Sequence, residues 1–507
     1  MKTYRLVLAV LVIAISLSAA SSAGAATFTV SPATHGSSDS TCRPCRSIGG
    51  AITKAGALAG TDRINVAAGS YSERLDLRPT NTVLLVGTGT VTVLVSALGY
   101  APALTLESNS TIRNIRFKVG GDVGIDMYGG RLESVKLSMS QSSGSTIGVA
   151  VRSGGVAASV IVGTTVEMPD AVIANYALNA ESDTQQVRVD RSVFNGGYAV
   201  NLTGNALVSI NRSKVSGSVY GFNLGGNGTL NLSNVLFVSQ THTWPGPPAF
   251  FDYGMGVHIE SRSSATVNIQ GSTFVGSGSA TSPGNYGLDV ERNGNNPSVN
   301  ITAVRTAFTG FQGVIREQDF GGSSDVFTTF NDVFFETASY DIPGSLSPVT
   351  TVSAISFPDP GFRNAAAGDY RPLSSSPLVD RSSIPLTNDG SDIRGGGRPR
   401  NGSSLRATDL DIGAYEYQPA PRNTRAAAVS GRARVGRVVS CRTGTWTGGV
   451  ARFGYQWYRG SRAIRRASRS TYRLTRSDRG ARVKCTVKAT SLDGAPKTVT
   501  TRSVRVG

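Results

Sequence analysis

Aromatic, acidic and histidine side chains gather in one stretch of the chain, residues 239–317. It opens with SQTHTWPGPPAFFDYG, residues 239–254, whose proline and glycine content predicts an irregular loop. Flat rings beside carboxylates are what a sugar chain needs, and loops on rigid scaffolds often carry function. We therefore predict a ligand site formed by the following residues: His242, Trp244, Phe250, Asp252, Tyr253, His258, Glu260, Asp289, Glu291 and Glu317. The alternative is that the rings only pack the loop onto its scaffold.

The carboxylates in this set are also the candidates for catalysis. Glycoside hydrolysis needs two carboxyl groups with different pKa values beside the scissile bond, and Glu260, Asp289 and Glu291 are available. Glutamates on neighbouring strands, about 4.8 Å apart, repel each other by about 1 kcal/mol per pair in water. Such a row would bind a divalent cation such as calcium, raise a carboxyl pKa, or be neutralised by arginines. The arginines close by in the sequence are Arg262, Arg292 and Arg316.

A repeated unit would bring these residues together. A small residue followed by alternating positions recurs in YALNAE, YAVNLT, YGFNLG, GVHIES and YGLDVE. Copies lie 22 residues apart at Ala177, Ala199 and Gly221. Period-2 alternation predicts strands with one buried face, and so short a unit buries that face only by stacking on the next copy. The repeat therefore predicts a parallel β-helix solenoid of about ten coils, since the frame of leucine-rich repeats is missing and a sandwich would need hairpins.

The repeat also predicts which side chains share a row. Leu288 and Val290 should point inward, while Asp289 and Glu291 should point to solvent. One outward row reads Asp126, Ala150, Asn179, Asn201, Asn223, His258, Asp289 and Ile315. The neighbouring row reads Tyr128, Arg152, Glu181, Thr203, Gly225, Glu260, Glu291 and Glu317. The three asparagines predict a ladder of stacked amides.

Composition and the N-terminus predict an exported protein. Glycine makes up 60 of 507 residues and charged residues 16%, which favours turn-rich β structure over charge-driven disorder. Residues 1–26 combine two basic residues, an apolar run from Leu6 to Leu17 and an A-x-A-like site near Ala26, which predicts a signal peptide. No later segment has 18 consecutive apolar residues, so we expect no transmembrane segment. The expected location is extracellular or cell-surface associated.

Two further segments resemble a known family. Residues 45–77, CRSIGGAITKAGALAGTDRINVAAGSYSERLDL, resemble the cap helix and first coil of right-handed parallel β-helix proteins, which include pectate lyases and polygalacturonases. Residues 369–380 and 411–417, DYRPLSSSPLVD and DIGAYEY, are similar to the closing segment of bacterial β-helix proteins called choice-of-anchor. For a lyase, the resemblance implies acidic residues that hold a metal and an arginine base, here Arg292 or Arg316. The paired-aspartate motif of polygalacturonases and the WIDH-type motif of pectate lyases are missing.

The C-terminal segment, residues 421–507, differs in composition from the rest. Cys441, Trp457 and Cys485 have the order seen in immunoglobulin-like sandwiches, which predicts a disulfide with the tryptophan packed on it. Cys42 and Cys45 are expected to close a small structural loop, because export permits disulfides. From Arg422 onward there are 21 basic residues and two acidic ones, Asp478 and Asp493, whereas the preceding part has 29 basic and 31 acidic. Crowded arginines suit carboxylate or phosphate groups.

The sequence therefore predicts an all-β protein: a signal peptide (residues 1–26), a right-handed parallel β-helix (27–420) and a small, basic Ig-like β-sandwich (421–507). We expect it to be a monomer that binds polysaccharide or an anionic cell-envelope polymer without catalysis, and we expect no nucleic-acid partner. The alternative is an extracellular polysaccharide lyase or glycoside hydrolase acting on an acidic glycan.

Overall fold

The structure is a computed structural model. It describes residues 25–32, 42, 44–58, 60–78, 82–96, 99–107, 109–140, 145–155, 158–169, 175–181, 186–240, 254–261, 264–277, 285–292, 298–319, 325–336, 349–351, 354–382, 384, 390–395, 398, 410–493 and 495–507. All but the last two residues of the predicted signal peptide lie outside this set. So do His242, Trp244, Phe250, Asp252 and Tyr253 of the predicted ligand site.

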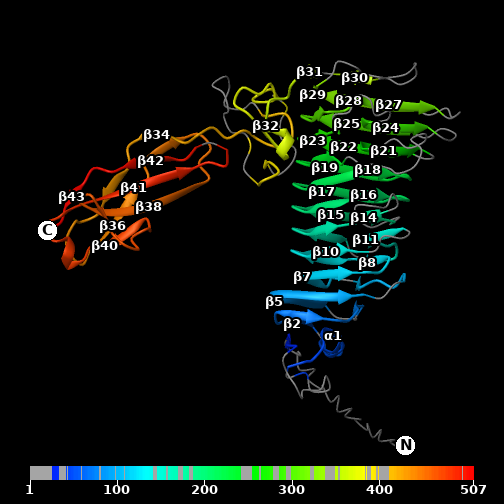
Figure 1. The fold of residues 1–507 in the computed structure, drawn as a ribbon, viewed down its shortest axis with the longest axis horizontal. Helices are drawn as coiled ribbons and strands as arrows, with labels where there is room; N and C mark the ends of the chain where they lie inside the picture. The colour runs from blue at the N-terminus through cyan, green and yellow to red at the C-terminus, as the bar shows by residue number, and fades with distance from the viewer. Residues whose placement is uncertain are drawn as a thin grey trace, which may run out of the picture.

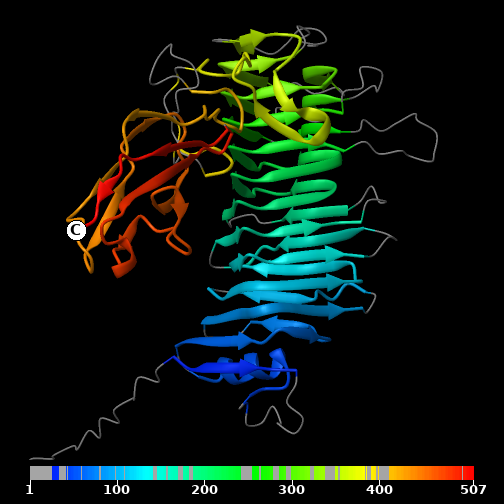
Figure 2. The same ribbon diagram turned by 60° about the vertical axis from the view of Figure 1, so that its left-hand side comes forward.

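Parallel strands form one continuous sheet that winds around the solenoid on three faces (Figures 1 and 2). Face 1 contains β4 (Leu75–Leu77), β6 (Leu104–Glu107), β8 (Val123–Tyr128), β11 (Thr146–Val151), β14 (Asn175–Ala180), the second halves of β16 (Val193–Leu202) and β18 (Lys214–Leu224), β21 (Met255–Ser261), β24 (Tyr286–Arg292) and β27 (Gly313–Asp319).

Face 2 contains β1 (Thr27–Val30), β2 (Thr61–Val66), the first parts of β5 (Thr82–Val95) and β7 (Thr111–Val119), β9 (Gly130–Glu133), β12 (Ser159–Val162), β15 (Gln186–Asp190), β17 (Leu207–Asn211), β19 (Thr229–Ser233), β22 (Ala265–Gln270), β25 (Ser298–Val304), β28 (Asp325–Asn331) and β30 (Val349–Thr351). Face 3 contains β3 (Gly69–Tyr71), the second parts of β5 and β7, β10 (Lys136–Met139), β13 (Thr165–Glu167), the first halves of β16 and β18, β20 (Leu236–Ser239), β23 (Thr273–Val275), β26 (Ala307–Thr309), β29 (Val333–Phe335) and β31 (Ala354–Ser356).

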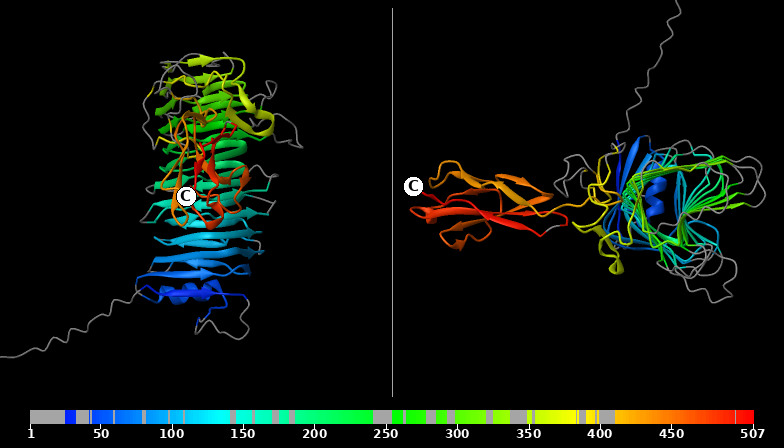
Figure 3. Two further views of the ribbon diagram at one scale, coloured as in Figure 1. Left: turned by 90° about the vertical axis from the view of Figure 1, so that its left-hand side faces the viewer. Right: turned by 90° about the horizontal axis from the view of Figure 1, so that it is seen from above.

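One helix, α1 (Ile48–Gly56), closes the first end of the solenoid (Figure 3, right). The Ser47 side chain caps it by accepting from Gly50 N at 3.0 Å, and the Glu73 carboxylate accepts from Ile48 N and Gly49 N, each at 2.8 Å. These contacts satisfy amide groups that a helix start leaves without intrahelical partners. Because Ile48 and Ala51 are fully buried, the helix seals the apolar interior from water.

The interior explains the small residue of the repeat. Phenylalanine rings stack along the axis, with centroids 5.8 Å apart for Phe237 and Phe274 and 5.1 Å apart for Phe274 and Phe308. A Cβ atom added at Gly221 would lie 2.4 Å from the ring of Phe237, and one added at Gly287 would lie 2.6 Å from that of Phe308. The small residue therefore makes room for the ring in its own coil.

Deleting one whole coil, residues 198–219, should shorten the solenoid without unfolding it. The deletion removes 22 residues and leaves Asn179 facing Asn223, so every strand keeps a partner in register. We expect the far-ultraviolet circular dichroism of a β protein to be retained. Deletion of 11 residues, which puts the outward row opposite an inward one, is the control and should abolish cooperative folding. Loss of β structure in both variants would contradict the assigned repeat.

The last segment of the solenoid region folds back over the coils. It includes the hairpin of β32 (Phe362–Asn364) and β33 (Asp369–Pro372), and Ile412 N donates to Leu378 O at 2.9 Å. Gly413 N donates to Arg305 O at 2.8 Å, which ties this segment to the coil of β25. We call residues 359–418 the closing segment, after its sequence resemblance.

The C-terminal strands are antiparallel and form a small sandwich beside the solenoid (Figures 1 and 3). They are β34 (Arg422–Arg425), β35 (Ala428–Ser430), β36 (Val438–Arg442), β37 (Thr445–Thr447), β38 (Arg452–Arg459), β39 (Arg462–Ala463), β40 (Thr471–Arg473), β41 (Arg482–Thr490), β42 (Lys497–Thr500) and β43 (Val504–Arg505). Trp457 is fully buried in one apolar cluster with the Cys441–Cys485 disulfide, as predicted, and the Cys42–Cys45 disulfide is also present. The predicted fold class is thus confirmed, whereas the three domain limits stay predictions.

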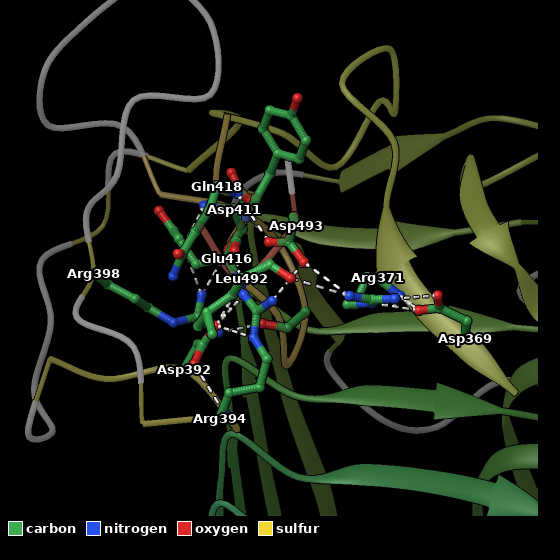
Figure 4. A network of polar contacts seen from close by, with 12 residues as sticks. Asp369, Arg371, Asp392, Arg394, Arg398, Asp411, Glu416, Gln418, Leu492 and Asp493 are labelled. Atoms are coloured by element: carbon green, nitrogen blue, oxygen red, sulfur yellow. Dashed lines mark hydrogen bonds and ion pairs between the residues drawn. The ribbon is translucent and has the colours of Figure 1, made fainter. Parts of the chain in front are cut away.

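One aspartate joins the sandwich to the closing segment (Figure 4). The side chain of Asp493 is 2% exposed, and its Oδ1 lies 2.6 Å from Arg394 Nη1 and 3.4 Å from Arg371 Nη1. Its Oδ2 accepts from Gln418 N at 3.1 Å, and Arg363 donates to its backbone carbonyl. Because both oxygens and the carbonyl bind the closing segment, this residue is the centre of the contact.

Candidate functional site

Face 1 carries a continuous run of polar side chains across its outer surface. The predicted amide ladder is confirmed, because Asn201 Nδ2 donates to Asn179 Oδ1 and Asn223 Nδ2 donates to Asn201 Oδ1, both at 2.7 Å. Asn179 Nδ2 in turn donates to Glu181 Oε1 at 2.7 Å. Stacked amides of this kind fix the spacing of the coils and hold their outer surface rigid.

The ladder leads to an ion-pair cluster on β21, β24 and β27. Asp289 is fully buried, and its Oδ2 lies 2.8 Å from His258 Nδ1. Its Oδ1 accepts from Arg316 Nε at 2.6 Å. Register pairing places Asn223, His258, Asp289 and Arg316 side by side on successive strands, so strand pairing itself assembles the cluster.

The cluster separates the pKa values of two neighbouring carboxyl groups. Burial raises the pKa of Asp289, but hydrogen bonds from His258 and Arg316 outweigh it, so the pKa lies below 3.8. Burial raises the pKa of Glu291 above 4.5, and the negative charges of Asp289 and Glu260 add to this effect. Glu291 therefore holds its proton to a higher pH than an ordinary glutamate does, whereas Asp289 stays ionised.

Two predictions about this face are wrong. Asp289 occupies an outward position but is fully buried rather than solvent-exposed, because its partners enclose it. Glu317 does not continue the row of Glu260 and Glu291: β27 pairs one residue away from the predicted register, so Val290 faces Glu317 and Glu291 faces Gln318. Glu317 is accordingly only 8% exposed, and the expected row of three glutamates is a row of two.

The register shift has a packing reason. The predicted alignment placed Ile315 in the outward row opposite Asp289. In the structure Ile315 faces Leu288, and both side chains are fully buried in the interior. The shift also places Arg316 against Asp289, where the charges attract. Burial of an isoleucine, worth about 2–3 kcal/mol, and an ion pair together favour the observed register.

Sequence reasoning missed a row of tyrosines on the same face. Tyr176, Tyr198 and Tyr220 are half-buried at the start of three successive strands, with ring centroids 5.0 and 5.1 Å apart. The ring of Tyr220 stacks on that of His258, with centroids 4.2 Å apart and planes 7° apart. Burial, with smaller contributions from Tyr176 and Glu260, raises the pKa of Tyr198 to about 12, so its hydroxyl stays a donor. The signal was present in the repeat itself, as the first letter of YALNAE, YAVNLT and YGFNLG.

Three residues of the cluster have the side-chain types and spacing of a metal site. Donor atoms of His258, Asp289 and Glu291 lie within 4.8 Å of one another. However, the Arg316 guanidinium already neutralises Asp289, and a cation would have to bind beside this positive charge. The residues thus fit a hydrogen-bonded ion-pair cluster better than a calcium site, since calcium takes six to eight oxygen ligands.

The remaining predicted residues contribute in different ways. Glu260 lies next to Glu291 in register, as predicted. Arg316 lies over the ring of Tyr286, 4.8 Å from its centroid, besides binding Asp289, so it is held in place rather than available as a base. Arg292 belongs to β24, but its side chain lies outside the described part of the structure, as does Arg262.

None of the helices in the described part of the chain has the length and apolar character that a membrane crossing requires. Comparison of the chain with protein-family models, with curated proteins and with solved structures returned no match.

Proposed function

We propose that the protein is a secreted, envelope-associated β-helix that binds a carbohydrate chain on face 1 without catalysing its cleavage. The observation that carries this proposal is the tyrosine row beside the Asp289 cluster. Half-buried rings spaced by the coil repeat offer stacking surfaces for successive sugars, and the amides and carboxylates next to them offer hydrogen bonds to hydroxyl groups. All of these groups project from a rigid parallel sheet, so binding orders few side chains.

The C-terminal sandwich supports the envelope part of the proposal. Its two acidic residues are both used in structural contacts, Asp493 at the closing segment and Asp478 with Arg459 at 2.7 Å and Tyr472 Oη at 2.9 Å. Asp478 is fully buried, so the outer surface is left to arginines and lysines. A surface with this charge attracts anionic polymers such as acidic glycans or wall polymers. The signal-peptide-like start and the disulfides fit an oxidising, extracellular location.

The geometry supports binding over cleavage. A hydrolase needs two accessible carboxyl groups beside the substrate, but both oxygens of Asp289 are held in buried contacts. One observation nevertheless favours hydrolysis as the second candidate function: Glu291, whose pKa is raised, lies in register with Glu260. In that case Glu291 acts as the general acid, and Glu260 is the second carboxyl group.

Replacement of Tyr198 by alanine should weaken glycan binding about tenfold, because one ring–sugar stacking contact of about 1.4 kcal/mol is lost. The measurement is a titration of the full chain against acidic and neutral polysaccharides, with reducing and unsaturated ends assayed in parallel. Tyr100→Ala is the matched control, since Tyr100 is 85% exposed away from the row and should have no effect.

Three results would count against this proposal. If no polysaccharide binds, carbohydrate binding is wrong; if both tyrosine variants bind alike, face 1 is the wrong surface. Release of reducing ends that disappears in Glu291→Gln would replace binding with hydrolysis.

A further inference from the structure

The corner between face 2 and face 3 is built in the same way in successive coils. Each coil has one residue there with φ between 46° and 57°: Asn114, Ser134, Gly163, Arg191, Arg212, Asn234, Gly271, Arg305 and Asp332. This left-handed conformation is uncommon for residues other than glycine, so its recurrence shows that the bend itself repeats. The side chains of the residues around the bend therefore form rows along the axis.

Serine hydroxyls hold this corner rigid. Ser213 Oγ accepts from Ser192 N at 3.1 Å in the preceding coil and donates to Asn211 O at 2.7 Å in its own. Ser192 and Ser272 make the same two contacts with their neighbours. Each hydroxyl thus links two coils at the bend, and the backbone there is a fixed support for outward side chains.

Two hollows open on this corner and lie end to end. One, of about 340 Å³, is lined by the bends of β5, β7 and β9–β10 and by Gly163 and Thr165. The other, of about 500 Å³, begins at Arg191–Val193 and ends against the closing segment, at Arg394 and Tyr415. Thr165 pairs with Val193, and Val193 N donates to Thr164 O at 2.8 Å, so the hollows occupy neighbouring coils. Together they form one groove along the solenoid axis, which we call the corner groove.

The corner groove is basic although the chain before Arg422 is close to neutral. Its outward row across β7, β10, β13, β16 and β18 reads Arg116, Lys136, Thr165, Val193 and Lys214. Lys136 has an acidic partner, Glu167, at 2.8 Å. In the part of the chain that the structure describes, no carboxylate lies within ion-pair distance of Arg116 or Lys214, which line the two hollows.

The second hollow has further guanidinium groups. Arg191 and Arg212 lie at the bend and share one carboxylate, Asp190, whose oxygens are 2.9 Å from Nε of each. Two arginines with a single acid leave one positive charge uncompensated at this point. Uncompensated cations thus recur along the groove, near its start at Arg116 and near its end at Arg212 and Lys214.

We propose that the corner groove binds a linear acidic polysaccharide through its uronate carboxylates. Arg116 and Lys214 lie four strands apart, about 19 Å at 4.8 Å per strand, with hydroxyl-bearing and apolar positions between them. That pattern fits a polymer whose charges alternate with neutral, hydroxyl-rich stretches. It fits single-stranded nucleic acid less well, because no aromatic ring lines the first hollow for base stacking. The inference rests on the proposed carbohydrate binding and adds the ligand class and a second surface, remote from the tyrosines.

The test is a titration of the full chain with oligogalacturonate at about 0.15 M salt, where weak attraction to the basic sandwich is screened. The double variant Arg116→Gln, Lys214→Gln should bind about tenfold more weakly. The matched control is Arg63→Gln, Arg188→Gln: it removes two exposed positive charges from face 2, where each arginine only bonds a neighbouring amide. It should bind as the wild type does. Methyl-esterified oligogalacturonate, which lacks the charges, should bind none of these proteins tightly.

Each other outcome overturns a defined part of the inference. Uronate binding that neither double variant alters would leave carbohydrate binding standing and exclude the corner groove. Equal weakening in both variants would reduce the effect to overall charge. A wild type that binds no uronate would refute the groove, and one that binds no polysaccharide at all would also refute the proposed function. Tighter binding of an oligonucleotide, lost in the Arg116 and Lys214 variant, would show that the ligand class is wrong.

Discussion

Replacement of Asp493 by asparagine should release the C-terminal sandwich from the solenoid. The carboxylate is 2% exposed and meets Arg371 and Arg394, each of which also binds its own aspartate, Asp369 or Asp392. Removing one partner from a buried charge network costs about 3–5 kcal/mol, because the groups left behind stay desolvated. We expect small-angle X-ray scattering of the full chain to show a larger radius of gyration and maximum dimension than in the wild type.

The control for this experiment removes the same charge from an exposed ion pair. Asp76 pairs with Arg78 on β4, and both side chains are more than half exposed, so Asp76→Asn should change stability by less than about 1 kcal/mol and leave the scattering curve unchanged. Melting of the sandwich should persist in Asp493→Asn, since its disulfide and the Trp457 core are intact. Identical scattering from Asp493→Asn and the wild type would show that other contacts hold the two parts together.

Replacement of Asp289 by asparagine should cost about 3–5 kcal/mol at neutral pH, since His258 and Arg316 lose their buried counter-charge. The loss should depend on pH. The pKa of Asp289 is lower in the folded chain than its ordinary 3.8, so its contribution to stability is present above pH 4 and is lost as the pH falls through the folded-state pKa. The free-energy gap between wild type and variant, measured by urea unfolding, should narrow on acidification below about pH 4.

Asp126 supplies a control of opposite sign in the same outward row. Burial raises its pKa above 3.8 despite Arg152 at 3.1 Å, so its ionised form is disfavoured in the folded chain. Relative to Asp126→Asn, the wild type should therefore gain stability as the pH falls, not lose it. Hydrogen exchange should place the damage of Asp289→Asn in β21, β24 and β27, because each coil contacts only its neighbours. Equal pH dependence of the two variants would contradict the assigned pKa directions.

The fold was predictable because its repeat is written in side-chain size and polarity. A small residue must face each interior ring, and alternation assigns the faces, so Gly221, Gly256 and Gly287 align the coils without further information. That rule failed at β27, where Gly313 pairs with Tyr286 and not with Gly287. An isoleucine in an outward row was the sign that the alignment had slipped by one residue.

The candidate site was predictable only in part, because burial depends on neighbours in space. Strand pairing placed His258, Asp289, Glu260 and Glu291 together as predicted. It did not reveal that Arg316 would enclose Asp289 and so remove it from contact with a ligand. The corner groove depends on the closing segment, which meets the coils of β16 and β18 more than 150 residues later, and no local pattern encodes that contact.

The amide ladder has a direction, and this direction bears on how such a chain lengthens. Each asparagine donates to the coil before it and offers its oxygen to the coil after it, so Asn223 ends the series with Oδ1 as an acceptor facing His258. The donor of His258 points the other way, toward Asp289. A duplicated 22-residue coil inserted ahead of Asn223 therefore extends the ladder with every donor matched, whereas one inserted beyond it meets reversed polarity. Growth by coil duplication is thus favoured on one side of this junction, and the chemically distinct coils lie on the other.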